Sequence, residues 1–542
     1  MPNLLSMTGR KWILRSEEQR TPDILIDALK NERQLGPSSS PTSLSDPFLF
    51  PEMGKAVQRI QAGVQSKEIV GIFGDYDADG ITAALQLVRF FRRHGIEPIV
   101  HLPDRVTEGY GMKTKSIDAL HAKGVTLLIT VDTGISAHAE IAHAKAHGID
   151  VIVTDHHRPQ GGRPDAFVII HPMVPPGFPN PDLAGAGVAF TLVRALEDGK
   201  PWHGIEEDVV LATIGTVGDL VPLTGENRLL VIKGLRCAAR LRPSPLKELI
   251  NAVQGKKPLT STDIAFRIVP RINASGRMAH PDIALHALLD GGEALEQLHR
   301  LNEGRQELVG ELMVVASGLV DPASPFLCVI DDRFTPGTVG LIASRLTEEY
   351  GRPTLAGSVR GDDVVASLRS VDGVDLFDCL THPSVRPLLS TCGGHAMAAG
   401  CTLKRSAVSD LRSALNVLLI DRGITAASLI PTLHLDASIA HGDLSPVFAE
   451  ALETLAPFGQ GNEEPVFLLP KRKLTDVRTV GADNRHLQCR IGGIKGIGFG
   501  LGHLMQEIAG VADVDVACRV GINEWNGRRE VQVFVEDVKK SA

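Results

Sequence analysis

The sequence has few of the features that define secreted, membrane or cysteine-rich metal proteins. Its 542 residues include only seven cysteines, scattered and without a Cys-x-x-Cys pair, so neither a disulfide framework nor a structural zinc site is expected. No apolar run is long enough to span a bilayer, and no long apolar core precedes Arg10 and Lys11 that would indicate a secretory signal. The sequence therefore predicts a cytoplasmic protein with reduced thiols.

An excess of positive charge is also missing. The formal net charge is −8, so no global basic character indicates nucleic acid, although a local basic groove can lie on an acidic protein. The apolar content of 43% is typical of a globular chain with proper cores. The length exceeds that of one ordinary domain and predicts three or four.

Strands and helices alternate from about residue 68. This alternation predicts a parallel sheet with helices on its faces, and such sheets bind ligands at the carboxyl ends of their strands. Gly95 and Gly148 are expected to end two of the helices. The strands are expected at residues 68–73, 126–131 and 151–154, and the helices at residues 81–93 and 137–147.

Acidic clusters follow all three predicted strands. Because the carboxyl ends of parallel strands meet at one edge, these side chains are expected to form a site for hard divalent metals such as Mn²⁺ or Mg²⁺. Two such ions about 4 Å apart activate water and stabilise the leaving oxygen of a phosphoester. The sequence therefore predicts two-metal phosphoester hydrolysis. The clusters are Asp75, Asp77 and Asp79 before Gly80, then Asp132 in Asp-Thr-Gly, then Asp155, His156 and His157.

Two other interpretations of the first cluster are weaker. A calcium-binding EF-hand loop also opens D-x-D-x-D-G, but its twelfth position should be Glu, and here it is Gln86. The carboxylates could instead cap the helix that follows. One Asp could do so, whereas three together repel one another unless a cation or hydrogen bonds offset their charge.

The remaining sequence divides into recognisable regions. A further acidic element contains Asp219, after the apolar residues 209–214. Leucine periodicity over 283–320, interrupted at Gly291-Gly292, predicts a short helix followed by a long connecting helix. A second α/β unit begins near Pro325, and the last hundred residues alternate in short segments that predict a small β-barrel. Residues 34–51 are irregular, and the first fifty carry no interpretable motif.

The clusters resemble the motifs of the DHH phosphoesterase superfamily, and within it the chain is similar to the RecJ family of bacterial single-strand-specific 5′→3′ exonucleases. The resemblance runs from about residue 50 to the C-terminus. It also covers residues 103–111, 270–278, 301–306, 339–346, 367–370, 393–400 and 457–462. One departure is His171-Pro172-Met173, where the family more often has Asn-Pro.

The resemblance implies an α/β fold with four parts after an N-terminal segment. These parts are a parallel-sheet DHH catalytic domain, a connecting helix, a second α/β domain called the DHH-associated domain, and an OB-fold β-barrel. The implied boundaries are 1–50 for the N-terminal segment, then 51–282, 283–322, 323–430 and 431–542 for the four parts in turn.

Residue roles follow from the same resemblance. Asp132 and His157 would be catalytic, with His157 facing the scissile phosphate to stabilise charge or to help protonate the leaving oxygen. The metal ligands would be Asp75, Asp77, Asp79, Asp132, His156 and Asp219. The contacts to the 5′ phosphate and the strand would be Arg105, Tyr110, Arg277, Gln306, Ser367, Arg369 and His395. The OB-fold contacts would be Lys471, Arg472, Lys473, Arg485, Trp525, Arg528 and Arg529.

The implied activity is 5′→3′ degradation of single-stranded DNA to mononucleotides with two Mn²⁺ or Mg²⁺ ions, in recombination and mismatch repair. The implied partners are single-stranded DNA, a single-strand-binding protein and a RecQ-type helicase, with the chain itself a monomer. Three alternatives stay open: a hydrolase of short oligonucleotides or cyclic dinucleotides, a non-catalytic replication scaffold, and an inorganic pyrophosphatase. The OB-like C-terminal region disfavours the first and third, and the complete set of ligand positions disfavours the second.

Overall fold

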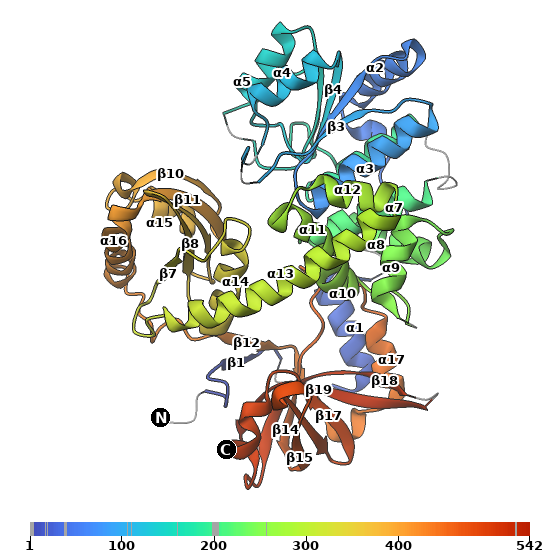
Figure 1. Cartoon of the computed structure of the whole chain (residues 1–542). Helices are drawn as coiled ribbons and strands as arrows, with labels where there is room; N and C mark the ends of the chain where they lie inside the picture. Colours follow the sequence, from blue (N-terminus) through green and yellow to red (C-terminus); the bar gives the residue numbers. More distant parts are fainter. Residues whose placement is uncertain are drawn as a thin grey trace.

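The computed structural model divides the chain into three lobes, two of which are joined by one long helix (Figure 1). We name each lobe by its sheet, as the first, second and third lobe in chain order. The structure describes residues 5–16, 18, 20–36, 41–105, 107–109, 111–159, 161–197, 205–255, 257–525 and 528–541.

The first lobe is built on a parallel sheet with strand order β3-β2-β4-β5-β6, which confirms the predicted parallel arrangement. Every residue of β2 and β4 is buried, as expected for central strands covered on both faces. A strand rather than a helix precedes the first acidic cluster, which excludes the EF-hand alternative. The strands are β2 (Val70–Phe73), β3 (Ile99–His101), β4 (Leu127–Val131), β5 (Asp150–Thr154) and β6 (Val168–Ile170).

Helices cover both faces of this sheet. One face packs against α2 (Met53–Ser66), α3 (Ala78–Arg93) and α6 (Gly185–Leu196) in a large apolar core. The other face packs against α4 (Thr114–Ala122) and α5 (His138–Ala146) in a separate core. These cores fix the sheet edge at which the acidic clusters lie.

A helical layer follows the sheet and leads to the long helix. The predicted break at Gly291-Gly292 is confirmed, because α12 ends at Leu289 and α13 begins at Gly292. A helix rises ~1.5 Å per residue, so the 27 residues of α13 make it long enough to cross from the first lobe to the second (Figure 1). The layer comprises α7 (Glu206–Gly218), α8 (Gly225–Arg240), α9 (Pro245–Gln254), α10 (Ser261–Asp263), η2 (Ile264–Ile268), α11 (Val269–Met278), α12 (Asp282–Leu289) and α13 (Gly292–Gly318).

The second lobe is a mixed five-stranded sheet with strand order β10-β11-β9-β8-β7, in which only β7 and β8 run parallel. It contains the expected second α/β unit. The strands are β7 (Leu327–Asp331), β8 (Thr354–Arg360), β9 (Asp363–Arg369), β10 (Leu389–Gly394) and β11 (Ala398–Lys404), and the helices are α14 (Val339–Tyr350), α15 (Leu376–Thr381) and α16 (Val408–Asp421).

The third lobe is a mostly antiparallel seven-stranded sheet, in the region for which a small β-barrel was expected. Its strand order is β13-β14-β18-β19-β17-β16-β15. The elements are β13 (Ala437–Ser438), α17 (Pro446–Glu453), β14 (Phe467–Arg472), β15 (Leu474–Val480), β16 (His486–Ile491), β17 (Ile494–Gly498), α18 (Met505–Ile508), β18 (Val514–Trp525) and β19 (Arg528–Lys540).

The first part of the N-terminal segment, uninterpreted from the sequence, joins this third lobe, whereas Leu44 and Phe50 pack in the core of the first lobe. Strand β1 (Lys11–Leu14) pairs in parallel with β12 (Thr432–Leu435), and α1 (Pro22–Glu32) lies beside α17 (Figure 1). Leu25, Ile26 and Leu29 enter the apolar core of the third lobe. Described residues near both ends of the sequence therefore lie in one lobe.

The remaining general expectations concern thiols and membranes. All seven cysteines are free, as predicted. Among the described residues, none of the helices combines the length and the apolar character needed to cross a bilayer.

Candidate metal centre

The first acidic cluster lies in the turn between β2 and α3. Asp77 is the N-cap of α3, and its Oδ1 accepts hydrogen bonds from the backbone N–H groups of Asp79 at 3.0 Å and Gly80 at 3.2 Å. One carboxylate therefore does cap the helix, but Asp75 and Asp79 point elsewhere. A side chain at Gly80 would lie 2.6 Å from the backbone nitrogen of Asp75, so the turn requires glycine there.

The second and third clusters lie at the ends of β4 and β5. Asp132 follows β4 in a left-handed conformation with φ of 58°, and its N–H donates to the carbonyl of Thr154 at 3.0 Å. Oδ1 of Asp155 accepts from the N–H groups of His156 at 2.7 Å and His157 at 3.0 Å. Asp155 therefore fixes the histidine turn rather than pointing into the centre.

The imidazole of His156 is where the clusters meet. Its Nε2 lies 3.1 Å from Oδ1 of Asp132, 3.6 Å from Oδ2 of Asp219 and 3.8 Å from Oδ2 of Asp79. Asp219 is the C-cap of α7, so it arrives from the helical layer rather than from the sheet. Four segments that are far apart in the chain thus supply one centre.

Asp132 also belongs to a second group of potential ligands. Carboxylate oxygens of Asp75, Asp77 and Asp132 lie within 4.8 Å of one another, and the same holds for ligand atoms of Asp79, His156 and Asp219. Asp132 lies beside both groups, 3.1 Å from His156. This arrangement suits two cations that share the Asp132 carboxylate.

Two buried polar atoms of the centre have no hydrogen-bond partner in the described part of the chain, as expected for residues that bind a metal. Oδ1 of Asp132 and Nε2 of His156 are buried and have no hydrogen-bond partner among the described residues. Burying such atoms without a partner is costly unless a cation or water satisfies them. Oxygen ligands with one or two imidazoles are the donor set of Mn²⁺ or Mg²⁺ rather than of structural zinc. The residues present therefore fit a pair of hard divalent cations.

Electrostatics lead to the same conclusion. Burial, together with the charge of Asp77, raises the pKa of Asp75 to about 8 and that of Asp79 to about 7. Burial and the charge of Asp79 raise the pKa of Asp219 to about 8, and burial and the same neighbour raise the pKa of Asp132 well above its ordinary value. Four neighbouring carboxyl groups can all be ionised at neutral pH only if nearby positive charge offsets their mutual repulsion.

The two histidines have opposite electrostatic environments. Burial and the neighbouring charge of His157 lower the pKa of His156 to about 4, which keeps its imidazole neutral, as a metal ligand must be. Burial also disfavours the charged form of His157, but a 2.8 Å hydrogen bond to Asp155 and nearby carboxylates outweigh it and raise the pKa to about 9. His157 thus carries a proton at neutral pH.

Several residues that position the centre were missed from the sequence. The N–H groups of Gly185 and Ala186, in the first turn of α6, donate to the two oxygens of Asp79 at 2.6 and 2.9 Å. A side chain at Gly185 would lie 2.6 Å from Cβ of Asp132, so only glycine allows this approach. The small-residue run from Ala184 to Ala189 was the available signal.

Two further positioning residues come from distant segments. Oδ1 of Asn273 accepts from the N–H of Ala78 at 2.7 Å and holds the start of α3. Nε2 of His171 lies 2.7 Å from the carbonyl oxygen of His157. His171 is the position that departs from the family pattern, and here it supports the histidine turn.

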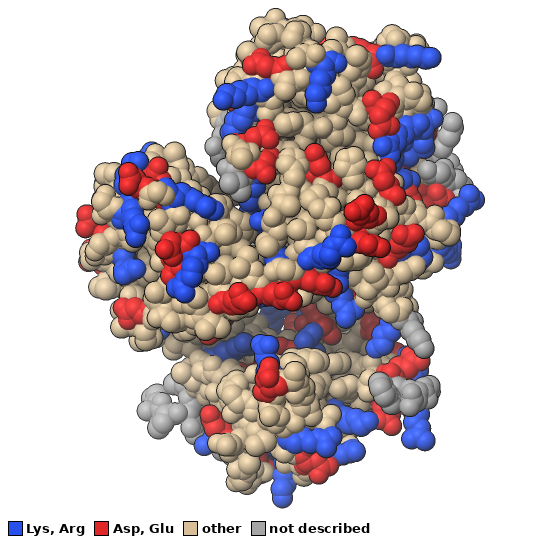
Figure 2. Space-filling model, in the orientation of Figure 1, with Lys and Arg blue, Asp and Glu red and all other residues tan. Residues whose placement is uncertain are grey.

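A cleft of about 1150 Å³ opens beside the centre and separates the first lobe from the second. Figure 2 shows a notch between these two lobes on the face in view. His157 lines the cleft from the first lobe, and His395, on the glycine-rich turn after β10, lines it from the second. The cleft therefore gives the centre access to a ligand held between the lobes.

Arginines gather where the lobes approach each other. Burial and the charges of Arg105, Arg305 and Arg369 lower the pKa of Arg277 to about 9, and burial and Arg105 also lower the pKa of Arg369. The guanidinium of Arg105 stacks on the ring of Tyr76 at 4.3 Å, and its Nε is buried with no hydrogen-bond partner among the described residues. Several guanidinium groups placed together, one of them with an N–H donor unpaired within the described residues, indicate a site for an anion.

The second lobe completes this anion site with a helix N-terminus. Nη1 of Arg369 donates to Oγ of Ser367 at 3.1 Å. A side chain at Gly340, in the first turn of α14, would lie 3.4 Å from that same oxygen. The N-terminus of a 12-residue helix next to an arginine and a hydroxyl suits a phosphate group. Gly340 and α14 were not assigned a role from the sequence.

The other sequence-predicted contacts lie on other parts of the described structure or outside the described residues. Gln306 is exposed on α13, while its neighbour Arg305 is the buried one. Arg485 and Arg528 are exposed on the third lobe, and the side chain of Trp525 and all of Tyr110 lie outside the described residues. The remaining third-lobe candidates, Lys471, Arg472, Lys473 and Arg529, lie on β14, in the turn after it and on β19, where Arg529 pairs with Glu450 at 3.0 Å.

The third lobe has a polar groove that the sequence did not indicate. Its volume is about 750 Å³. Arg478, Arg490 and Lys495 are its basic residues, on β15, β16 and β17 in turn. The groove also contains the amides of Gln488, Asn523 and Gln532.

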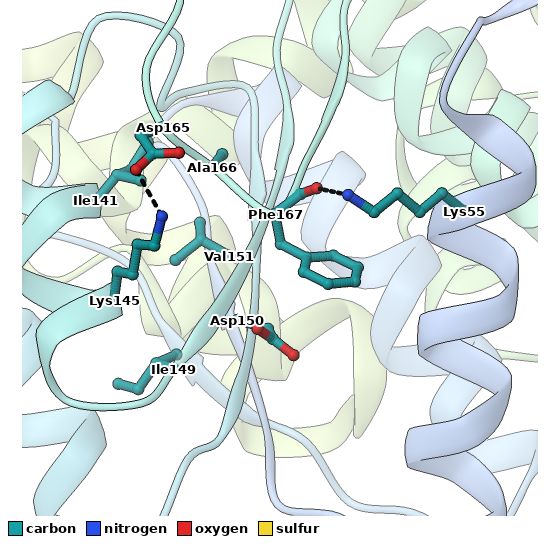
Figure 3. Close-up of a pocket in the computed structure, with 9 residues that line it drawn as sticks. All are labelled: Lys55, Ile141, Lys145, Ile149, Asp150, Val151, Asp165, Ala166 and Phe167. Atoms are coloured by element: carbon teal, nitrogen blue, oxygen red, sulfur yellow. Dashed lines mark hydrogen bonds and ion pairs between the residues drawn. The ribbon is translucent and has the colours of Figure 1, made fainter.

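Another hollow, of about 240 Å³, lies at the opposite end of the parallel sheet (Figure 3). Its charged groups are engaged with neighbouring groups. Lys145 pairs with Asp165 at 2.6 Å, Lys55 donates to the carbonyl of Phe167 at 2.8 Å, and Asp150 accepts from Arg59 at 2.6 Å. This hollow therefore presents no converging polar groups for a ligand.

Comparison with family models and relatives identifies the chain. Residues 69–216 match the DHH family N-terminal domain, 323–420 the DHHA1 domain and 435–537 the RecJ OB domain. The single-stranded-DNA-specific exonuclease RecJ of Bacillus subtilis is 36% identical over 515 residues, and that of Salmonella typhimurium is 34% identical over 505 residues, 86% of each chain. The chain belongs to the RecJ family.

A solved structure supports the assignment over almost the whole chain. The crystal structure of RecJ in complex with Mn²⁺ from Thermus thermophilus has a TM-score of 0.85 at 28% identity, covering 99% of this chain and 80% of that one. The predicted fold class, with DHH, DHH-associated and OB parts, is thereby confirmed. This RecJ-family chain spans 64% of the length of its Bacillus subtilis relative.

Proposed function

We propose that this chain is a metal-dependent exonuclease that degrades single-stranded DNA 5′→3′ to mononucleotides in recombination and repair. The observation that carries the proposal is the convergence of Asp79, Asp132, His156 and Asp219 beside an arginine-rich anion site. The names of the relatives, single-stranded-DNA-specific exonuclease RecJ, support the substrate.

The proposed ligands are Asp75, Asp77, Asp79, Asp132, His156 and Asp219, with Mn²⁺ or Mg²⁺ as the ions. Bound there, two such ions supply a water of lowered pKa and neutralise charge on the phosphate. The protein's own contribution is to hold the carboxylates in place, through Asp77 at the start of α3 and through the N–H groups that bind Asp79.

His157 is the proposed acid of the reaction. It lines the cleft, and its raised pKa keeps it protonated at neutral pH. Asp155 orients the ring through Nδ1 and stabilises its positive charge. A protonated imidazole there can stabilise charge on the scissile phosphate or donate a proton to the leaving oxygen.

The preference for a 5′ end follows from the anion site. We propose that Arg105, Ser367 and Arg369 hold the terminal phosphate, with Arg277 close by. Buried guanidinium groups and the N-terminus of α14 favour a doubly charged terminal phosphate over an internal phosphodiester. Tyr110, Gln306 and His395 are proposed to contact the strand near its end.

The third lobe is the proposed site for the rest of the strand. Arg485, Trp525 and Arg528 were expected there from the sequence, and the groove of Arg478, Arg490 and Lys495 adds polar and basic groups. A second site on the chain favours long strands over short oligonucleotides, cyclic dinucleotides or pyrophosphate. The proposed domains are 51–282, 283–322, 323–430 and 431–542, after an N-terminal segment of residues 1–50.

The proposed setting is the cytoplasm, where the chain acts as a monomer with a single-strand-binding protein and a RecQ-type helicase. The free cysteines are consistent with a reducing compartment.

Strands labelled at the 5′ or the 3′ end test the proposal. With Mn²⁺ present, the 5′ label should appear at once as a mononucleotide, while the 3′ label should stay in progressively shorter strands. Duplex DNA should remain intact, and so should single strands incubated with EDTA. Release of the 3′ label first, or internal cuts, would contradict the proposed polarity.

A further inference from the structure

Away from the metal centre, side chains typical of transition-metal sites gather between α4 and α5. Asp118 and His121 lie on α4, His143 lies on α5, and His147 is the C-cap of α5. Nε2 of His143 is 2.7 Å, and Nε2 of His147 is 3.5 Å, from the same oxygen, Oδ1 of Asp118. The rings of His121 and His147 lie 4.6 Å apart between centroids. We call these four residues the α4–α5 cluster.

We propose that the α4–α5 cluster binds one divalent ion of the zinc class, with Asp118, His143 and His147 as ligands and His121 as the fourth. Ligand atoms of the first three already lie within 4.8 Å of one another. Three imidazoles and one carboxylate form a nitrogen-rich set that suits zinc, nickel or copper. The oxygen-rich centre at Asp132 prefers different ions, so the two sites are chemically distinct.

The geometry differs from that of an ordinary surface ion pair. In such a pair, one imidazole contacts one carboxylate, as His286 does with Asp290 at 2.9 Å on α12. Here two imidazoles four residues apart in sequence aim at a single oxygen, and a third ring lies tilted beside one of them. A cation near that point would coordinate the carboxylate and both imidazoles at once, with His121 beside them as the candidate fourth ligand.

The fold holds the cluster ready and accessible. Ile117 and Leu120 of α4 and Ile141 and Ala144 of α5 share one apolar core, so the two helices keep their spacing without the ion. The side chains of His143 and His147 are 33% and 35% exposed, which leaves a path for an ion from solvent.

The cluster lies away from the cleft. Lys113 before α4, and Ala137 and Glu140 at the start of α5, line the cleft, whereas His143 and His147 lie toward the other end of α5. Seven residues of helix separate Glu140 from His147, or ~10 Å. The ion would therefore tie together the far ends of two helices whose near ends line the cleft.

Zinc content and affinity test the proposal on the full chain. Wild-type protein and a His143→Ala/His147→Ala variant are titrated with Zn²⁺ against a chromophoric chelator, in millimolar Mg²⁺. The variant should lose one Zn²⁺ per chain or bind it at least ten-fold more weakly, whereas His286→Ala should bind as the wild type does. Zn²⁺ should also raise the melting temperature of the wild type more than that of the variant. Equal stoichiometry and affinity in variant and wild type would overturn the proposal.

Two further measurements keep the test independent of the variant and of the nuclease. In crystals of the unmodified chain soaked in Zn²⁺, an anomalous peak should lie between Asp118 and His147, and peaks confined to the Asp132 centre would contradict the proposal. DNA degradation in Mg²⁺ should be the same for wild type and double variant, so failure of the nuclease proposal leaves the zinc site testable.

Discussion

Oδ1 of Asp132 lies 3.1 Å from Nε2 of His156, and neither atom has a hydrogen-bond partner among the described residues. One atom follows β4 and the other follows β5, at the same edge of the sheet. A buried acceptor that faces an imidazole nitrogen in this way is stabilised when a cation coordinates both.

Replacing Asp132 with Ala should abolish hydrolysis and leave strand binding largely intact. Loss of a residue that only orients a ligand costs about 10- to 100-fold in metal affinity or activity, so loss of a proposed shared ligand should cost more than about 100-fold. Rates and fluorescence-anisotropy binding are compared for the same labelled strand. Full activity in the variant would remove Asp132 from the site.

Gly185→Ala should impair the centre without altering a proposed ligand. The new Cβ would lie 2.6 Å from Cβ of Asp132 and would disturb the two N–H groups that bind Asp79. Affinity for Mn²⁺, measured by calorimetry, should fall by about 10- to 100-fold. Gly54→Ala is the matched control, because no atom lies within 4 Å of its Cβ position. Equal Mn²⁺ affinity in both variants would contradict this role of Gly185.

The stability of the metal-free protein should fall as pH rises. The folded-state pKa values of Asp75, Asp79 and Asp219, at about 8, 7 and 8, lie above their ordinary value of 3.8. The contribution of these groups to the free energy of unfolding is therefore fully present below about pH 4, and it is lost as the pH rises toward 8. Melting temperatures in EDTA between pH 5.5 and 8.5 should show this decline, and Mn²⁺ should reverse it.

Asp219→Asn is the control for that pH dependence. Without one titrating carboxyl, the decline in EDTA should be shallower than in wild type by up to about 1.4 kcal/mol per pH unit. Identical pH profiles for the two proteins would show that burial and the neighbouring carboxylates do not raise the pKa of Asp219.

Arg369→Ala should remove the preference for a phosphorylated 5′ end. A hydrogen bond to a charged group contributes about 1.5–3 kcal/mol, so a strand with a 5′ phosphate should lose roughly 10- to 100-fold in kcat/KM. A strand with a 5′ hydroxyl should lose much less. Arg360→Ala, an exposed arginine at the end of β8, should leave both rates unchanged. A uniform loss on both substrates would argue against a role at the 5′ phosphate.

Arg528→Ala should weaken strand binding in a salt-dependent way. Each lost phosphate contact reduces the slope of log affinity against log salt concentration by about 1. Anisotropy titrations over a salt series compare it with Arg300→Ala, an exposed arginine on α13 that pairs with Glu296. Unchanged affinity across the series would exclude Arg528 from the strand path.

The place of the candidate centre could be predicted from the sequence because it follows from the topology of a parallel sheet. Asp77, Asp132 and His156 each follow an apolar strand, and parallel strands end at one edge, so their proximity needs no knowledge of distant contacts. Asp219 was noted as an acidic residue after an apolar run, but its role as a ligand came only from the family resemblance, because it approaches from the C-terminus of α7 and not from a strand.

Partners from distant segments could not be predicted in the same way. Asp79 is held by Gly185 and Ala186, the start of α3 by Asn273, and His157 by His171, and nothing local in the sequence specifies those pairings. The pairing of β1 with β12 joins residues over 400 positions apart for the same reason. Periodicity identifies elements, whereas long-range packing decides which elements meet.

The most direct test of a two-metal centre at Asp132 is an anomalous diffraction map of the chain crystallised with Mn²⁺. Two manganese peaks are expected, one among Asp79, His156 and Asp219 and one among Asp75 and Asp77, with Asp132 between them. The absence of manganese from this pocket, or peaks only elsewhere in the molecule, would contradict a two-metal centre.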